Sequence, residues 1–107
     1  MIRQLSVREL KQRLDQGTNN FTLLDVREPW ERNICALPGA TTIPMREIPA
    51  RAEELPKDQE IVVVCHHGVR SQQVASYLAR LGFNQLNNLT GGIDAWAREI
   101  DPKMPTY

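Results

Sequence analysis

The chain has 107 residues, of which thirteen are basic, thirteen are acidic and 41% are hydrophobic. This length fits one domain, so we expect residues 1–107 to form a single domain in which 101–107 are an extended tail. The balanced charge argues against a nucleic-acid or membrane-surface partner, since either usually leaves an excess of basic residues. The chain has only two cysteines and neither a signal-peptide-like start nor a long apolar run, so we expect a cytoplasmic protein.

Strand and helix patterns alternate along the chain. Residues 3–5 are predicted as a short edge strand, and a helix follows Ser6, where Glu9 completes a capping box, and stops at Gly17. Four elements are predicted in the middle of the chain: a strand at 21–26, a short helix at 29–34, a strand at 41–43 and an amphipathic helix at 48–55.

The second half continues the same alternation. Residues 61–64 are apolar on both faces, as a central parallel strand should be. The next helix ends at Gly82, a weaker strand covers 85–89, and a last helix follows Gly91-Gly92. Alternating strands and helices with short connections predict an α/β sandwich with a parallel sheet.

The segment 65–71 lies where the predicted central strand ends and reads Cys-His-His-Gly-Val-Arg-Ser. Ligands of open parallel sheets lie beyond this edge, toward which helix N-termini also point. Gly68 lets the backbone turn its N–H groups inward as an anion-binding nest, the following helix adds its positive dipole end, and Arg70 adds a charge. These surroundings favour the thiolate of Cys65, which makes it a candidate nucleophile. The alternative is an inert buried cysteine selected for its volume.

This segment resembles the active-site loop of single-domain rhodaneses, the thiosulfate sulfurtransferase family. Three further segments resemble signatures of that family in the same order: Leu-Asp-Val-Arg-Glu at 24–28, Leu-Pro-Gly-Ala at 37–40 and Leu-Thr-Gly-Gly-Ile-Asp-Ala-Trp at 89–96. One position departs from the pattern, since Cys35-Ala36 stand where many members carry Gly-His. The resemblance implies a three-layer sandwich with a mostly parallel sheet of about five strands and helices on both faces.

The resemblance also implies sulfur transfer in two steps without a metal or an organic cofactor. Cys65 would take a sulfane sulfur from thiosulfate or another persulfide-type donor, and the resulting persulfide would pass it to cyanide, a cellular thiol or a thiol of a partner protein. The residues expected to cradle the sulfur and bind the donor share the loop: His66, His67, Gly68, Val69 and Arg70. Ser71, Asp25 and Arg27 are expected to support that loop.

Several of these residues have a second interpretation. Arg70 could grip two oxygens of an anionic donor, or it could pair with a carboxylate and serve only the structure. His66 and His67 could tune donor access or be exposed loop residues with little effect. We expect no metal site, because adjacent histidines on a tight loop point apart and no third ligand is evident. Cys35 could act as a resolving thiol or simply pack.

Two other functions compete with sulfur transfer. Cysteine phosphatases and arsenate reductases also hold a thiolate in a cradle of N–H groups, but phosphatase loops read Cys-x5-Arg, whereas Cys65 and Arg70 form Cys-x4-Arg. The shorter ring suits a single sulfur atom better than a phosphate. Rhodanese-like domains can also be non-catalytic binding or regulatory modules, although these often lack the loop cysteine.

Overall fold

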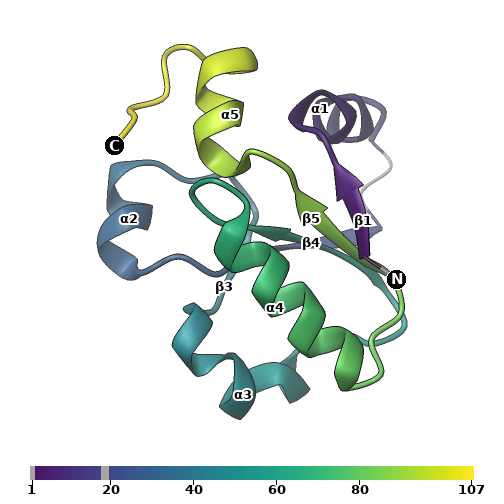
Figure 1. Ribbon diagram of the computed structural model, residues 1–107. Helices are drawn as coiled ribbons and strands as arrows, with labels where there is room; N and C mark the ends of the chain where they lie inside the picture. Colours follow the sequence, from purple (N-terminus) through teal and green to yellow (C-terminus); the bar gives the residue numbers. More distant parts are fainter. Residues whose placement is uncertain (1, 18–19) are drawn as a thin grey trace.

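The computed structural model describes residues 2–17 and 20–107, and within them five strands form one parallel sheet (Figure 1). The strands are β1 (Ile2–Leu5), β2 (Phe21–Asp25), β3 (Thr41–Thr42), β4 (Glu60–Val64) and β5 (Leu86–Leu89). Their spatial order is β1-β5-β4-β2-β3, and every neighbouring pair is parallel. The predicted α/β fold with a five-stranded sheet is therefore confirmed.

The described residues also form five α-helices, of which four lie between strands and the last follows β5: α1 (Val7–Asp15), α2 (Pro29–Ile34), α3 (Ile48–Arg51), α4 (Val69–Arg80) and α5 (Gly92–Glu99). The predicted capping box at the start of α1 is present, because the Ser6 hydroxyl accepts from the Glu9 N–H and the Glu9 carboxylate accepts from the Ser6 N–H. In the described part of the chain, no helix has both the length and the apolar character needed to cross a membrane.

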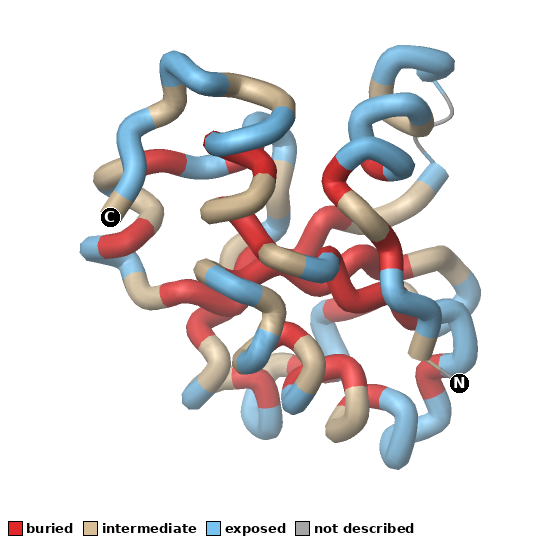
Figure 2. Tube along the Cα trace, turned by 45° about the horizontal axis from the view of Figure 1, so that its top comes forward, coloured by how far each residue is buried: buried red, intermediate tan, exposed pale blue. Residues whose placement is uncertain are grey.

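The helices cover both faces of the sheet, which gives three layers (Figures 1 and 2). Strand β4 shows why, since Ile61 and Val63 pack with residues of α3 and α4, whereas Val62 and Val64 pack with residues of α1 and α5. All four side chains are at most 1% exposed. Burial on both faces favours apolar side chains at successive positions, which accounts for the continuous apolar sequence 61–64.

The strand order places β4 in the middle of the sheet, between β5 and β2. Val64 is in register with Asp25, and the Val26 N–H donates to the Val64 carbonyl at 3.0 Å. The residues that follow β2 and β4 consequently leave the sheet at the same edge. Cys65 and Arg27 are brought to this edge from distant parts of the sequence.

Two predicted elements differ from the structure. The segment 48–55 is not one helix, because α3 is only four residues long and 3₁₀ turns at 45–47 and 52–54 flank it. Arg51 has φ −119° and ψ 5°, outside the helical region, so the α-helical hydrogen bonds stop there. The predicted extended tail 101–107 begins instead with a turn, in which the Met104 N–H donates to the Asp101 carbonyl at 3.0 Å.

Candidate active site

Cys65 is the first residue after β4, and it is 1% exposed. Its sulfur accepts hydrogen bonds from the N–H groups of Gly68 at 3.1 Å and Ser71 at 3.3 Å. Gly68 has φ +98°, in the left-handed region, and this conformation turns the chain back over the sulfur just before α4 begins. Two N–H donors at the start of a helix stabilise negative charge on the atom that they face.

A side-chain network continues from the sulfur into the sheet. The Ser71 hydroxyl lies 3.2 Å from the Cys65 sulfur and donates a short hydrogen bond to the Asn88 side-chain oxygen. The Asn88 amide nitrogen donates to the Gly68 carbonyl at 3.2 Å and to the Gln4 side chain at 3.0 Å. Because the Ser71 hydroxyl donates its one hydrogen to Asn88, its oxygen can accept a hydrogen bond from the Cys65 thiol.

Asn88 was not expected at this site from the sequence. The sequence feature that could have indicated it is the pair of asparagines between Leu86 and Leu89 in β5, since polar side chains buried in an interior strand need internal hydrogen-bond partners.

Helix α5 anchors the outer side of the loop. The N–H of Ile93 donates to the Cys65 carbonyl at 2.9 Å, and the N–H of Asp94 donates to the His66 carbonyl at 3.0 Å. A side chain at Gly92 would place its Cβ 2.4 Å from the Cys65 carbonyl oxygen, so only glycine fits this approach. With these two carbonyls turned toward α5, the planar peptide units turn the N–H groups of His66 and His67 away from it.

Asp25 and Arg27 form a buried ion pair beside the loop. The Arg27 guanidinium is fully buried and donates to both carboxylate oxygens of Asp25 and to the Cys35 carbonyl, the latter at 2.8 Å. Burial opposes the charge of Arg27, but hydrogen bonds to Asp25 and Tyr107 raise its pKa above the ordinary value. Asp25 and Arg27 are therefore partners of each other, and their support of the cysteine loop stays a prediction.

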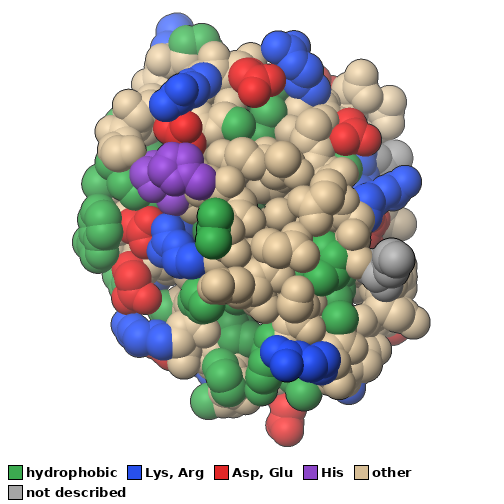
Figure 3. All heavy atoms as spheres, viewed as in Figure 1, with side chains coloured by type: hydrophobic (Ala, Val, Ile, Leu, Met, Phe, Trp, Pro, Cys, Tyr) green, Lys and Arg blue, Asp and Glu red, His purple; other side chains and the backbone are tan. Residues whose placement is uncertain are grey.

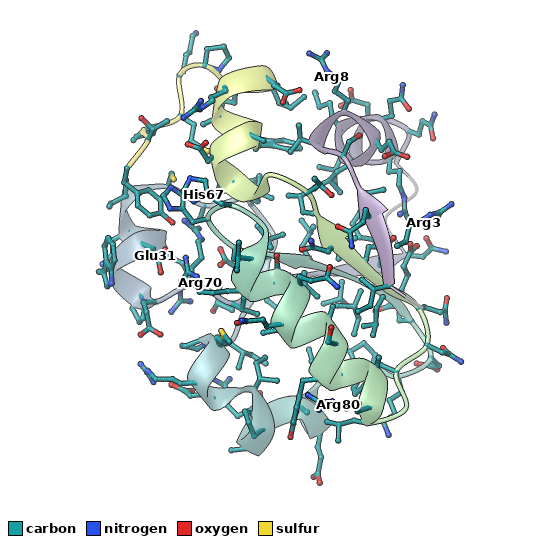
Figure 4. All side chains as sticks on the ribbon, in the orientation of Figure 1. Arg3, Arg8, Glu31, His67, Arg70 and Arg80 are labelled. Carbon is teal, nitrogen blue, oxygen red and sulfur yellow. The ribbon has the colours of Figure 1, made fainter. Side chains whose placement is uncertain are left out.

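Arg70 forms the carboxylate pairing that was the alternative to donor binding. Its two terminal nitrogens each lie 2.7 Å from an oxygen of Glu31 on α2, and Figure 4 shows the two side chains next to each other. The hydrogen bonds from Arg70 lower the pKa of Glu31 to about 2, although burial opposes this shift. Glu31 also accepts from the Tyr107 hydroxyl at 2.8 Å.

Glu31 and Tyr107 were not expected at this site from the sequence. Glu31 lies in the short helix α2, where the sequence pattern accounts for it as the partner of Glu28 in a capping box. Tyr107 lies in a tail that carries no structural pattern in the sequence. Burial raises the pKa of Tyr107 to about 12, so its hydroxyl keeps its proton and can donate to Glu31.

The two histidines of the loop stack instead of pointing apart. The His66 ring lies between Tyr107 and His67, with both centroid distances at 3.9 Å, and Figure 3 shows the histidines at the surface beside charged side chains. Asp94 is a possible third metal ligand, because ligand atoms of the three residues lie within 4.8 Å of one another. The expectation that the two histidines point apart and have no third ligand nearby is therefore wrong.

Cys35 and Val69 lie apart from the sulfur cradle. Cys35 is buried in the core cluster that contains α1 and α5, whereas Cys65 belongs to the cluster on the other face of the sheet, and both are free thiols. Val69 is 67% exposed at the first position of α4. Burial of Cys35 in the core agrees with a packing role.

A family model for the Rhodanese-like domain matches residues 6–99. The chain belongs to the rhodanese-like domain family. It is 41% identical over 98 residues to a sulfurtransferase of Allochromatium vinosum, an alignment that covers 92% of this chain and 91% of that protein. It is 38% identical over 102 residues to the putative sulfurtransferase YtwF of Bacillus subtilis, covering 95% and 97% respectively.

The structure of this rhodanese-like domain has close counterparts among solved structures. A rhodanese-like domain protein from Staphylococcus aureus superposes with a TM-score of 0.84 at 30% identity, over 99% of each chain. Other relatives are longer proteins, of which this chain spans between 24% and 54%. The domain therefore occurs both alone and as a part of larger proteins.

The family signatures have physical roles in this rhodanese-like domain. The segment 24–28 supplies the Asp25–Arg27 pair, and the segment 89–96 supplies the helix start that holds the carbonyls of the loop. In the segment 37–40, Gly39 has φ +79°, which a turn here requires. Ala36, at the position where many members carry histidine, is exposed.

Proposed function

We propose that this rhodanese-like domain is a sulfurtransferase in which Cys65 carries a sulfane sulfur as a persulfide. The observation that carries the proposal is the position of the Cys65 sulfur, which faces the N–H groups of Gly68 and Ser71 at 3.1 and 3.3 Å. A cradle of this kind favours an anionic sulfur both before and after transfer. The sulfurtransferase names of close relatives point to the same chemistry.

In the first step the Cys65 thiolate attacks the sulfane sulfur of thiosulfate or of another persulfide-type donor. A new sulfur–sulfur bond forms as the sulfur–sulfur bond of the donor breaks, and with thiosulfate the electron pair of the broken bond leaves on sulfite. The Ser71 hydroxyl can turn from Asn88 to donate to the sulfur once the thiol proton has left. His66, His67, Gly68, Val69 and Arg70 would then line the approach of the donor.

In the second step a thiophilic acceptor attacks the outer sulfur of the Cys65 persulfide. Cyanide leaves as thiocyanate, and a cellular thiol leaves as its own persulfide, while Cys65 returns as a thiolate. An acceptor thiol on a partner protein is equally suited, and a relative with 35% identity carries the name putative sulfur carrier protein YrkF. A cytoplasmic location would keep both cysteines reduced and Cys65 ready for the next cycle.

The competing functions fit this site less well. A phosphatase or arsenate reductase uses its loop arginine on the oxyanion, whereas Arg70 here is bound to Glu31 through both terminal nitrogens. A purely regulatory module would not need two N–H donors and a hydroxyl directed at a buried cysteine sulfur. Both remain distinguishable by experiment.

Intact-protein mass spectrometry after incubation with a sulfane donor tests the proposal. We expect the wild-type chain to gain the mass of one sulfur, to lose it when cyanide is added, and to gain nothing when Cys65→Ser is incubated in the same way. Cys35→Ser is the matched control and should behave as the wild type. Absence of an adduct with thiosulfate and with alkyl persulfides would favour a binding module, and faster turnover of an aryl phosphate would favour a phosphatase.

A further inference from the structure

The side chains of His66, His67 and Asp94 meet where the cysteine loop contacts the start of α5. Ligand atoms of the three residues, one from each, lie within 4.8 Å of one another. The backbones of the two segments are already joined there, since the Asp94 N–H donates to the His66 carbonyl at 3.0 Å. Figure 4 shows His67 beside the lower end of α5. The cluster therefore lies on a contact that backbone hydrogen bonds hold in place.

His66 brings a nitrogen that lacks a partner. Its Nε2 is buried and forms no hydrogen bond with any residue that the structure describes. A buried polar atom without a partner is costly, and a bound ion is one arrangement that satisfies it. Burial lowers the pKa of His66, and the neighbouring His67 acts in the same direction, so the ring is neutral near pH 7. A neutral imidazole is the form that binds a metal ion.

Asp94 and His67 bring two further donors that solvent can reach. The Asp94 side chain is 15% exposed, and its carboxylate lies 3.8 Å from Nε2 of His67, whose side chain is 59% exposed. Arg98, one helical turn later, lies 3.1 Å from the same carboxylate, but the arginine side chain is 72% exposed. Such an exposed ion pair contributes little, so Asp94 can exchange Arg98 for a metal ion at small cost.

Two imidazoles and one carboxylate form a donor set that suits zinc. Zn²⁺ binds histidine nitrogen and carboxylate oxygen at about 2.0–2.2 Å, and three protein ligands with a water molecule are a common arrangement. Ligand atoms of such a tetrahedral ion are about 3.4 Å apart, so the separations in the cluster must shorten by at most about 1.4 Å. The rings of His66 and His67 are inclined by 33°, and the exposed His67 side chain can turn to close this gap. Mg²⁺ and Ca²⁺ prefer oxygen ligands alone.

We propose that His66, His67 and Asp94 form a binding site for a divalent transition-metal ion, with Zn²⁺ as the expected ion, which fastens the cysteine loop to α5. Two of the ligands directly follow Cys65 in the chain, and the third belongs to the helical turn that holds the carbonyls of Cys65 and His66. Metal binding therefore stabilises the loop conformation that shapes the sulfur cradle. This inference replaces the expectation of no metal site, and it does not depend on sulfur transfer by Cys65.

NMR of the imidazole nitrogens tests the site directly, because the chain has only two histidines. One equivalent of Zn²⁺ added to the isotope-labelled chain should shift one ring nitrogen of each histidine, and further Zn²⁺ should change neither signal. Cys65→Ser should show the same shifts, which separates this site from metal binding by the thiol. Shifts of one ring only, shifts that do not saturate, or shifts that vanish in Cys65→Ser would overturn the proposal.

A variant of Asp94 tests the third ligand. Asp94→Asn keeps the shape of the side chain and removes its charge. The Zn²⁺ affinity, measured by competition with a chromogenic chelator, should fall by at least about tenfold, since even groups that only orient a metal ligand contribute that much. Asp15→Asn is the matched control, because Asp15 is also in an i,i+4 ion pair, with Lys11, but lies at the end of α1. An unchanged affinity in Asp94→Asn, or equal losses in both variants, contradicts the role of Asp94.

Thermal unfolding tests whether the ion stabilises the fold through these side chains. Saturating Zn²⁺ should raise the thermal midpoint of the wild type and of Asp15→Asn, because an ion that binds only the folded chain stabilises it. His67→Ala removes a mostly exposed ring, so without Zn²⁺ it should unfold close to the wild-type temperature. With Zn²⁺ its midpoint should rise much less than that of the wild type. Equal rises in His67→Ala and the wild type would place the ion elsewhere and overturn the proposal.

Discussion

The hydrogen-bond network around the Cys65 sulfur is built from three separate stretches of the chain. Gly68 and Ser71 are close in sequence, but Asn88 comes from β5, and Gln4 on β1 holds Asn88 in turn. The Ser71 hydroxyl has a single hydrogen, which it donates to Asn88 in the structure and which it would have to donate to Cys65 once the thiol is ionised. This exchange links ionisation of Cys65 to the hydrogen bonds of the sheet.

The ionisation of a single residue, Glu31, is predicted to make the stability of the fold depend on pH. Its pKa in the folded chain is about 2, below the ordinary value of 4.5, mainly because Arg70 donates hydrogen bonds to it. Its ionisation therefore stabilises the fold above pH 4.5, and this contribution is lost as the pH falls toward 2. The shift corresponds to about 3 kcal/mol, at 1.36 kcal/mol for each pKa unit. We expect the difference in free energy of unfolding between wild type and Glu31→Gln to be largest near pH 6 and to shrink steadily below pH 4.5.

Urea unfolding at a series of pH values measures this difference. Glu54→Gln serves as the control, because Glu54 is exposed and solvent screens its pairing with Arg51, so the pH-dependent loss in that variant should be much smaller. A difference between wild type and Glu31→Gln that stays constant from pH 6 to pH 2 would show that Arg70 does not stabilise the Glu31 carboxylate.

At the scale of elements, the start of α5 determines the shape of the cysteine loop. Its N–H groups hold the carbonyls of Cys65 and His66, and this contact needs the backbones to approach more closely than a side chain at Gly92 permits. The helix therefore acts on the cradle from outside, without contacting the sulfur. The glycine pair at 91–92 belongs to the site for this reason.

Gly92→Ala should separate α5 from the loop. The new Cβ would lie 2.4 Å from the Cys65 carbonyl oxygen and 2.5 Å from that of His66, at a residue that also has φ +60°. We expect a loss of stability of about 2–4 kcal/mol and slower formation of the Cys65 persulfide. Urea unfolding and the rate of mass gain in intact-protein mass spectrometry measure the two effects.

Gly39→Ala is the matched control for backbone strain. Gly39 has φ +79°, but a Cβ there would meet no atom within 4 Å. Its cost should be about 1 kcal/mol from the left-handed conformation alone, with no effect on the Cys65 reaction. Equal losses in the two variants would mean that the contact between α5 and the loop adds nothing.

At the scale of the whole molecule, Tyr107 joins parts that are far apart in the sequence. Its ring stacks on His66 and meets Trp30 of α2 edge-on, while its hydroxyl accepts from Arg27 at 3.1 Å and donates to Glu31 at 2.8 Å. Figure 1 shows the end of the chain returning beside α2. The tail thus closes the side of the site that the sheet leaves open.

Tyr107→Phe keeps the stacked ring and removes only the hydroxyl. The buried Arg27 and Glu31 side chains are then each left with one partner fewer, which should lower the thermal midpoint in line with a loss of about 1–2 kcal/mol. Tyr77→Phe on α4 is the control and should cost less than about 0.5 kcal/mol. If both variants unfold at the wild-type temperature, the hydroxyl of Tyr107 does not contribute to the cluster.

Local patterns in the sequence were sufficient for most of the fold. The apolar run of β4, the capping box at Ser6 and the glycine-bounded helices depend on neighbours in the chain, so the elements and their parallel arrangement could be predicted. The segment 48–55 was the exception. Its regularly spaced apolar residues Ile48, Ala52 and Leu55 are buried as a helix would bury them, but the backbone from residue 52 forms a 3₁₀ turn. Spacing records which side chains are buried, but it does not record whether the helical hydrogen bonds continue.

The candidate nucleophile was likewise evident from the sequence, because Cys65, Gly68 and Ser71 lie within one short loop after a strong strand. What surrounds that loop was decided only by the tertiary structure. Glu31, Asn88 and Tyr107 reach it through strand order and through the return of the tail, and no local pattern encodes such contacts. A charge such as that of Arg70 could be read from the sequence, but whether it is free or neutralised depends on which carboxylate the fold places beside it.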